Sequence, residues 1–252
     1  MKIHRFIDNF DLTKKELEIS GEIAHQIIKV LKLKVGEKIE ICDKKGTYAI
    51  AKIVKIEKNT VLIEINELIK NQNTDKHINL FCAILKKENF ELVVQKATEC
   101  GVSKIIPVIT ARTIKTGLNM ERLQKIAKEA SEQSGRVNVP EILEPIKFND
   151  ISETKIEDSI NIVFDISGES LFEMHKNFQQ KIFSVHRRHD SQGISNNDSP
   201  SINIFIGPEG GWTEEEIEKA NSSNFKIASL GSLTLRGETA AIIATYLISN
   251  LC

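Results

Sequence analysis

Apolar and polar positions alternate along much of the first 70 residues, which is typical of strands with one buried face. Three such stretches lie at residues 37–43, 47–57 and 60–68, and short polar turns separate them. Between residues 21 and 33 the apolar residues recur instead at helical spacing, behind Ser20, a residue type that often caps helices. The pattern therefore predicts a small β-barrel with one helix.

Beyond residue 77 the pattern changes to an alternation of strand-like and helix-like segments. Such alternation is typical of a largely parallel sheet with helices on both faces. Gly101 is placed to end the first of these helices. The predicted strands are at residues 78–85, 102–109, 160–166, 202–207 and 225–231, and the predicted helices are at residues 88–100, 120–134, 212–223 and 237–251.

A polar stretch at Lys70–His77 separates the two patterns and predicts a domain boundary. Residues 1–72 would form the barrel domain, and residues 73–252 would form an α/β domain. Residues 185–201 show no periodicity and are predicted to be a mobile surface insertion. The insertion contains an H-x-x-H pattern without a third ligand, so we expect no metal.

The composition is that of a globular protein with a real core, since 40% of the 252 residues are apolar and 27% are charged. No apolar run is long enough to span a bilayer, the N-terminus lacks a signal-peptide core, and the four cysteines are scattered. We therefore expect a reduced, cytoplasmic compartment and no membrane. Residues 1–72 carry 14 Lys and Arg against 11 Asp and Glu, an excess that permits an anionic partner without requiring one.

The segment Ile206–Ala220 joins a predicted strand to a predicted helix through a glycine-rich loop, which is the layout of a phosphate-binding turn. The loop holds no lysine, and Glu209 lies within it. Thr213 and Glu216 have the spacing of a capping box, which would occupy the free N–H groups of the helix. Because the nearby carboxylates would also repel a phosphate, the loop is predicted not to bind one.

A second glycine loop, within Ile227–Ala244, has the same layout and carries Arg236 and Glu238 at its turn. Open α/β sheets place ligands at the carboxyl ends of their strands, so two such loops would form a pocket there. Taken alone, the first loop is explained equally well as a tight turn with glycines at positive φ. In a pocket, exposed backbone groups suit the edge of an adenine, and Glu209 suits a ligand with a positively charged amino or sulfonium group.

The two loops, GPEGGWTEEE and LGSLTLRGETAA, resemble the paired signature of the bacterial small-subunit ribosomal RNA methyltransferase E family. Members of this family are N3-uridine methyltransferases of the SPOUT class. Further matches lie at residues 25–46, 93–112 and 129–142, in the family's order. The resemblance covers essentially the whole chain except residues 146–201.

The resemblance implies a PUA-like, RNA-binding β-barrel followed by a SPOUT-type α/β domain whose C-terminal part is tied in a trefoil knot. It also implies S-adenosylmethionine as cofactor and a homodimer with active sites at its interface. The reaction would be methylation of N3 of a specific uridine in small-subunit (16S) ribosomal RNA, in an assembled or assembling particle. Two alternatives stay open, namely methylation of another RNA atom such as a ribose 2′-O, and a non-catalytic RNA-binding module.

The resemblance also implies roles for individual residues. Arg236 would be catalytic, by stabilising negative charge on the base, and Glu238 would orient Arg236 or accept the N3 proton. A third cofactor loop would lie near Ser167–Gly168. The cofactor-binding residues would be Ile206, Gly207, Glu209, Gly210, Gly211, Leu230, Gly231, Leu235 and Thr239. The RNA-binding residues would be Arg5, Lys32, Lys86, Arg112 and Arg136.

The chain departs from the family pattern at a few positions. Gln26 and Lys32 replace a histidine and an arginine, which weakens or reshapes the RNA contacts implied there. Ser232 and Leu233 replace a proline and an arginine, which removes one positive charge near the pocket. None of these departures affects the glycines of the two loops or the two charged residues assigned to catalysis.

Overall fold

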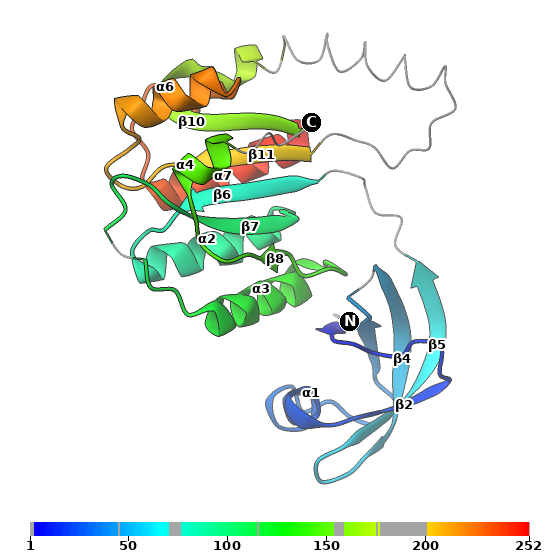
Figure 1. Ribbon diagram of the computed structural model, residues 1–252. Coiled ribbons are helices and arrows are strands. Elements are labelled where there is room, and N and C mark those ends of the chain that lie inside the picture. The colour runs from blue at the N-terminus through cyan, green and yellow to red at the C-terminus, as the bar shows by residue number, and fades with distance from the viewer. Residues whose placement is uncertain are drawn as a thin grey trace. The chain divides into compact units, whose positions relative to one another are not determined.

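The protein was analysed as a computed structural model that describes residues 3–44, 46–70, 77–114, 116–153, 159–174, 176 and 201–251. The insertion predicted at residues 185–201 lies almost wholly outside these residues. The chain divides into two compact units, drawn with their elements in Figure 1. The first unit combines Met1–Thr74 with Lys128–Val139, and the second combines Asp75–Ala127 with Pro140–Cys252.

The first unit contains a five-stranded sheet with the strand order β1-β3-β4-β5-β2. The three strands expected from the alternating pattern are present, and two short strands precede them. Their side chains that point inward, such as Ile39, Ile41 and Ile53, are fully buried in one core. The strands are β1 (His4–Ile7), β2 (Glu16–Ile19), β3 (Lys38–Cys42), β4 (Thr47–Ile56) and β5 (Val61–Lys70).

The predicted helix of the first unit is divided into α1 (Gly21–His25) and a π-helical turn, η1 (Gln26–Val30). Ser20 has the extended backbone of an N-cap, but its side chain makes no capping hydrogen bond. The wider turn arises because Leu31 N–H donates to the Gln26 carbonyl at 2.8 Å. Lys32 then adopts the left-handed conformation, with φ of 53°, and ends the helix.

The segment Lys128–Val139 packs within the first unit through polar and apolar contacts. Glu132 Oε1 accepts a hydrogen bond from Ile7 N–H at 3.0 Å, so a helix side chain binds the exposed edge of β1. Arg5 donates to Glu40 at 2.7 Å and to the Gly135 carbonyl. Val137 is buried against Ile7 and Cys42. Nothing in the sequence indicated that this later segment belongs with the barrel.

The second unit is built on a seven-stranded sheet with the order β12-β10-β11-β6-β7-β8, and β9 also pairs with β7. Every strand pair in it is parallel, as predicted. Its strands are β6 (Ile78–Ala83), β7 (Lys104–Ile109), β8 (Glu141–Ile142), β9 (Ile146–Lys147), β10 (Ser159–Ser170), β11 (Ser201–Ile206) and β12 (Lys226–Ser229).

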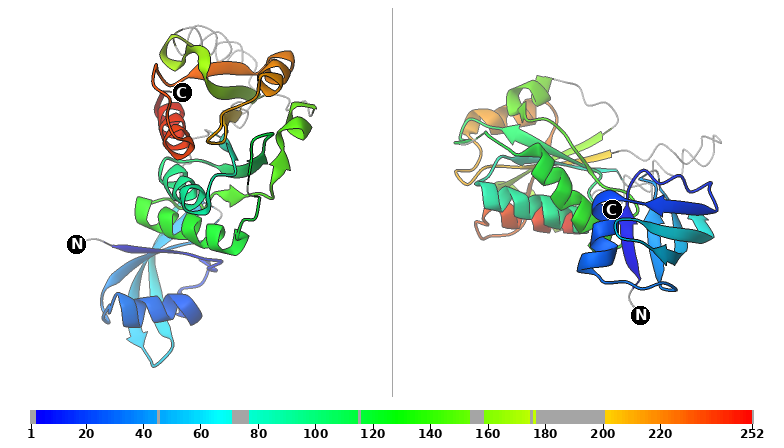
Figure 2. Two further views of the ribbon diagram at one scale, coloured as in Figure 1. Left: turned by 90° about the vertical axis from the view of Figure 1, so that its left-hand side faces the viewer. Right: turned by 90° about the horizontal axis from the view of Figure 1, so that it is seen from below.

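Helices cover both faces of this sheet, and Figure 2 shows α2 and α7 on one side with α4 and α6 on the other. The left-handed Gly101, with φ of 98°, ends α2 as predicted. On the α4 and α6 side, Phe205 stacks on Phe81 at 4.5 Å between ring centroids and lies in one core with Trp212. The helices are α2 (Lys87–Glu99), α3 (Met120–Ser134), α4 (Phe148–Glu153), α6 (Glu214–Ser222) and α7 (Gly237–Leu251).

A row of asparagines crosses the three central strands at one level. Asn79, Asn203 and Asn161 are register partners on β6, β11 and β10. Asn79 donates to Asn203 Oδ1 at 2.9 Å, and Asn203 donates to Asn161 Oδ1 at 2.7 Å. Because Asn203 is almost fully buried, a shift of register by one residue would leave its amide without partners.

The path of α7 bears on the trefoil knot implied by the family resemblance. After β12, at one edge of the sheet, the chain returns to pack α7 on β6, β11 and α2. The first residue of α7, Gly237, lies against the Gly207 carbonyl, at the loop that follows β11. Such a crossing is what a knotted path requires, and the knot itself stays a prediction.

We predict that Glu132→Gln stabilises the protein more at pH 8 than at pH 4. Burial raises the pKa of Glu132 above its ordinary value, although the hydrogen bond from Ile7 N–H opposes this effect. A carboxyl group with a raised pKa in the folded state contributes less stability as pH rises from its unfolded pKa through its folded pKa. The glutamine amide oxygen still accepts from Ile7 and does not titrate.

Urea unfolding of both proteins at the two pH values measures this difference. Exposed Glu129→Gln, on the same helix, is the control and is expected to change the free energy of unfolding by less than about 0.5 kcal/mol at either pH. An equal effect of Glu132→Gln at pH 4 and pH 8 would contradict the assignment.

Candidate functional site

A pocket of about 180 Å³ opens at the carboxyl ends of β10, β11 and β12, where both glycine loops begin. Its walls combine apolar side chains with backbone of the loops that follow the three strands. The third wall is Phe164–Ile166, not Ser167–Gly168, because β10 continues to Ser170 beside β12 and Gly168 packs against the backbone of Ala228. The remaining lining residues are Ile206, Gly207, Pro208, Glu209, Gly211, Trp212, Ser229, Leu230, Gly231, Leu233, Thr234, Leu235, Gly237 and Ala240.

The first loop is folded around Trp212. The indole N–H donates to the Phe164 carbonyl at 3.1 Å, which joins the loop to the end of β10. A Cβ at Gly207 would lie 3.0 Å from the Trp212 indole nitrogen, so a larger residue there would require the indole to shift. Gly211 supplies the left-handed residue of the turn, with φ of 71°. Trp212 is therefore both a packing residue and a wall of the pocket.

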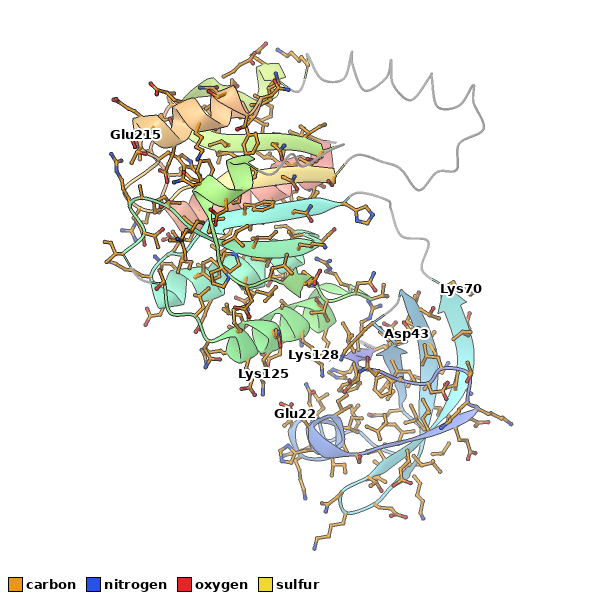
Figure 3. All side chains as sticks on the ribbon, viewed as in Figure 1. Glu22, Asp43, Lys70, Lys125, Lys128 and Glu215 are labelled. Atoms are coloured by element: carbon orange, nitrogen blue, oxygen red, sulfur yellow. The ribbon has the colours of Figure 1, made fainter. Side chains whose placement is uncertain are left out.

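The capping box predicted after this loop is confirmed. Thr213 accepts a hydrogen bond from Glu216 N–H, and Glu216 Oε2 accepts from Thr213 N–H at 2.9 Å. Glu216 is buried, whereas Glu214 and Glu215 are exposed on the first turn of α6, where Figure 3 labels Glu215. The Glu216 N–H in the first turn of α6 thus has a partner within the protein, which agrees with the interpretation against a phosphate site.

The second loop folds back on itself and then meets the first loop. Ser229 Oγ donates to the Gly231 carbonyl at 2.8 Å and accepts from Gly231 N–H. Gly237 begins α7 where a Cβ would lie 2.9 Å from a Leu85 methyl carbon and 3.4 Å from the Gly207 carbonyl oxygen. The two loops are consequently in contact, and they close the pocket from adjacent sides.

The two residues predicted to be catalytic have contrasting environments. Arg236 is exposed between the lining residues Leu235 and Gly237, and within the described part of the chain it forms no ion pair. Glu238 is buried, and its Oε2 atom accepts no hydrogen bond from any residue that the structure describes. No hydrogen bond or ion pair joins them among these residues, so the predicted orientation of Arg236 by Glu238 has no geometric support here.

Most of the residues predicted to bind a cofactor line the pocket. Gly210 and Thr239 do not, since Gly210 packs on Arg112 and Thr239 lies within the first turn of α7. The wall from β10 lies just before the loop expected near Ser167–Gly168, and Trp212 lines the pocket although the sequence assigned it no contact with the cofactor. The predicted residues that line it are Ile206, Gly207, Glu209, Gly211, Leu230, Gly231 and Leu235.

The five residues predicted to contact RNA differ in their exposure and in the partners that they already have within the protein. Lys32 and Lys86 are exposed. The Arg5 side chain is only 13% exposed and pairs with Glu40, so its place in the structure is that of a packing residue of the first unit. Arg136 is partly buried, and this burial lowers its pKa to about 10. Arg112 donates to backbone carbonyls of the first loop. These contacts with RNA stay predictions, and of the five residues Lys32, Lys86 and Arg112 are exposed.

Cys42 and Cys82 have environments that disfavour thiolate chemistry. Burial raises the pKa of the Cys42 thiol to about 12, and burial next to Glu209 and Glu238 raises the pKa of Cys82 further. Within the described residues no cluster of three metal-ligating side chains occurs. A search of the same residues finds no helix that is long and apolar enough to cross a membrane.

Comparisons with known proteins agree with this architecture. The family model for an RNA methyltransferase domain matches residues 72–249, and the model for an RNA methyltransferase PUA domain matches residues 19–66. The fold and these matches define an RNA methyltransferase with an additional PUA domain. The chain belongs to the ribosomal RNA small subunit methyltransferase E family, which confirms the resemblance and the fold class inferred from the motifs.

Individual relatives match over nearly their full lengths. Ribosomal RNA small subunit methyltransferase E of Rickettsia conorii is 33% identical over 247 residues, which cover 97% of this chain and 94% of that protein. The protein of the same name from Bacillus subtilis is 31% identical over 253 residues and covers 95% and 94%. The crystal structure of the Neisseria gonorrhoeae enzyme bound to S-adenosyl methionine has a TM-score of 0.83 at 27% identity, covering 99% of this chain and 98% of that one.

We predict that Gly237→Ala destabilises the protein by about 1–3 kcal/mol, because the added methyl group meets buried Leu85 and the Gly207 carbonyl. The higher helix propensity of alanine, worth up to about 1 kcal/mol, offsets part of this cost. Urea unfolding measures the change. Gly117→Ala is the matched control, since nothing lies near its Cβ position, and it is expected to be neutral or slightly stabilising. Wild-type stability of Gly237→Ala would contradict the contact between the loops.

Proposed function

We propose that this protein transfers a methyl group from S-adenosylmethionine to N3 of a uridine in small-subunit ribosomal RNA. The observation that carries the proposal is the pocket formed by the two glycine loops, with an exposed Arg236 between two of its lining residues. The names of the relatives from Rickettsia conorii and Bacillus subtilis support the RNA substrate. The structure of the Neisseria gonorrhoeae enzyme, with its bound S-adenosyl methionine, supports the cofactor.

The residues of the pocket fit this cofactor. Apolar walls from Phe164, Ile206 and Leu235 suit the faces of an adenine, and the exposed backbone of the loops suits its polar edge. The Glu209 carboxylate at the rim suits the positive charge of the amino or sulfonium group. When bound, S-adenosylmethionine supplies a methyl group that its sulfonium already activates, so the protein mainly positions the reactants.

The chemistry at uridine requires a way to handle negative charge. N3 carries a weakly acidic proton, and negative charge develops on the base as that proton leaves. The guanidinium of Arg236 is available to donate hydrogen bonds to the O2 or O4 atom of the base and to stabilise this charge. The unsatisfied Oε2 of Glu238 is a candidate acceptor for a proton or for an incoming donor group.

A separate part of the proposal concerns the substrate, which is either naked RNA or RNA within a ribosomal subunit. We propose that the barrel contacts RNA through exposed lysines such as Lys32, and that the substrate is an assembled or assembling subunit. The surface of the protein is nearly neutral overall, with a net charge of −1, so shape recognition has to supplement charge. Methyl transfer to assembled subunits, compared with transfer to naked RNA, tests this part of the proposal.

We predict that Arg236→Ala lowers methyl transfer at least about a hundredfold, because it removes a donor to the developing charge. Its affinity for S-adenosylhomocysteine is expected to stay within about threefold of wild type, since Arg236 does not line the pocket. Transfer of labelled methyl groups to small subunits and calorimetry measure the two quantities. Mapping the modified base by mass spectrometry identifies N3, another atom such as a ribose 2′-O, or no product.

The control for this variant is Arg122→Ala, which removes an arginine of α3 that pairs with Glu91 outside the pocket. Full activity of Arg236→Ala would refute its catalytic role. A wild-type protein that binds neither S-adenosylmethionine nor S-adenosylhomocysteine would refute the whole proposal and favour a non-catalytic RNA-binding module.

We also propose that the protein is a homodimer in which α7 lies at the interface. The sequence of α7, GETAAIIATYLISNL, is apolar almost all around, as is typical of a helix buried on every side. One face packs on the sheet, yet Ile243 and Tyr246 on another face are exposed, with Tyr246 at 57%. A second copy of the chain would cover these side chains.

We predict that Tyr246→Glu converts the dimer to a monomer at micromolar concentration, because it places a charge in an apolar contact. Sedimentation equilibrium measures the mass. Leu68→Glu, at an exposed apolar position on β5 of the barrel, is the matched control and is expected to leave the mass unchanged. A monomeric wild type would disprove the dimer.

A further inference from the structure

Arg112 lies in a short turn that follows β7 and is held by its own hydrogen bonds. Thr110 N–H donates to Thr113 Oγ1 at 2.9 Å, and Thr113 N–H donates to the Thr110 carbonyl at 3.2 Å. Thr110 is buried, so the turn has a fixed position at the edge of the sheet. The turn presents the Arg112 side chain and the Ala111 N–H to the first glycine loop.

Two groups of this turn bind the first loop directly. Arg112 Nη1 donates to the Gly210 carbonyl and to the Trp212 carbonyl, the latter at 3.2 Å. The aliphatic part of Arg112 packs on Gly210, where a Cβ would lie 3.2 Å from Arg112 Cδ. The lack of a side chain at Gly210 is therefore explained by this packing against Arg112, and not by access of a ligand to the backbone.

The second group is the Ala111 N–H, which donates to Glu216 Oε1 at 2.9 Å. The other carboxylate oxygen of Glu216 accepts from Thr213 N–H, also at 2.9 Å. One buried carboxylate thus joins the β7 turn to the start of α6. Together with the hydrogen bonds from Arg112, it attaches the segment 210–216 at two backbone carbonyls and one carboxylate.

The attached segment forms part of the pocket, because Gly211 and Trp212 line it. A change in the position of the Gly210 and Trp212 carbonyls would move the indole ring away from Phe164. We infer that Arg112 is a positioning residue that holds the Trp212 wall of the pocket in its binding geometry, in place of the RNA contact that the sequence indicated. The identity of the ligand used below rests on the proposed function.

The variant Arg112→Gln tests this inference in the complete protein. Glutamine is too short to reach both carbonyls, so the affinity for S-adenosylhomocysteine is expected to fall about tenfold, as loss of a charge-assisted hydrogen bond does. RNA affinity is expected to stay at the wild-type value. Trp212 is the only tryptophan in the chain, so its emission reports on the loop directly. Without any ligand, the variant is expected to show a shifted emission and greater quenching by iodide.

Two further variants make the result specific. Arg112→Lys keeps a positive donor but cannot form a planar fork, so an intermediate affinity and an intermediate emission are expected. It also carries the test if Arg112→Gln does not fold. Arg122→Gln, the same substitution at the arginine that pairs with Glu91, is expected to leave both the affinity and the Trp212 emission unchanged.

If Arg112→Gln keeps the wild-type emission and cofactor affinity, the inference is overturned. If the variant loses only RNA affinity, Arg112 is an RNA contact, as the family resemblance implied. The emission measurement needs no ligand. If wild type binds no S-adenosylhomocysteine, the proposed function fails, while a shifted Trp212 emission in Arg112→Gln still supports the positioning role.

Discussion

The common register of three parallel strands is the constraint on which the rest of the second unit depends. Asn203 hydrogen-bonds to Asn79 on one side and to Asn161 on the other, at one level of the sheet. Two residues further along, Phe205 stacks on Phe81. Because Asn203 is almost fully buried, its amide needs these partners, and they fix the register in which β6, β11 and β10 run toward the loops.

The glycines in those loops occupy their positions for different physical reasons. At Gly207 and Gly237 a side chain would collide with Trp212 or Leu85, so the absence of Cβ permits close contact of the two loops. At Gly211 the backbone has a positive φ, which other residues adopt at a cost. Gly210 accommodates the stem of Arg112. A single interpretation of these glycines as ligand contacts therefore explains only some of them.

The sequence predicted the larger elements well because each has a periodic apolar face and a recognisable end. The predicted bounds of α3 and α7 agree with the structure, and the capping box of Thr213 is present. Short β1 and β2 were missed because four residues give too little periodicity. The repeated Ile-Asn at the start of three predicted strands is a signal in the sequence from which the asparagine row could have been predicted.

The candidate site was predicted less completely, since side-chain partners depend on contacts distant in sequence. Backbone positions of the two loops were found because they follow strands directly. The wall from Phe164 was misplaced because β10 continues past its apolar run. The RNA contacts predicted at Arg5 and Arg112 stay predictions, but the sequence did not reveal that these arginines donate to Glu40 and to a loop carbonyl.

The first unit combines two segments that lie far apart in the sequence, and this affects the order in which its contacts form during synthesis. Domains of a nascent chain commonly fold from the N-terminus as each one is completed. Here the barrel strands end by Lys70, yet the groups that pair with Arg5 and Ile7, at Gly135 and Glu132, belong to a segment made much later. The barrel therefore stays incomplete while Asp75–Ala127 is translated, and its last contacts form only after the residues of β6 and β7 have been made.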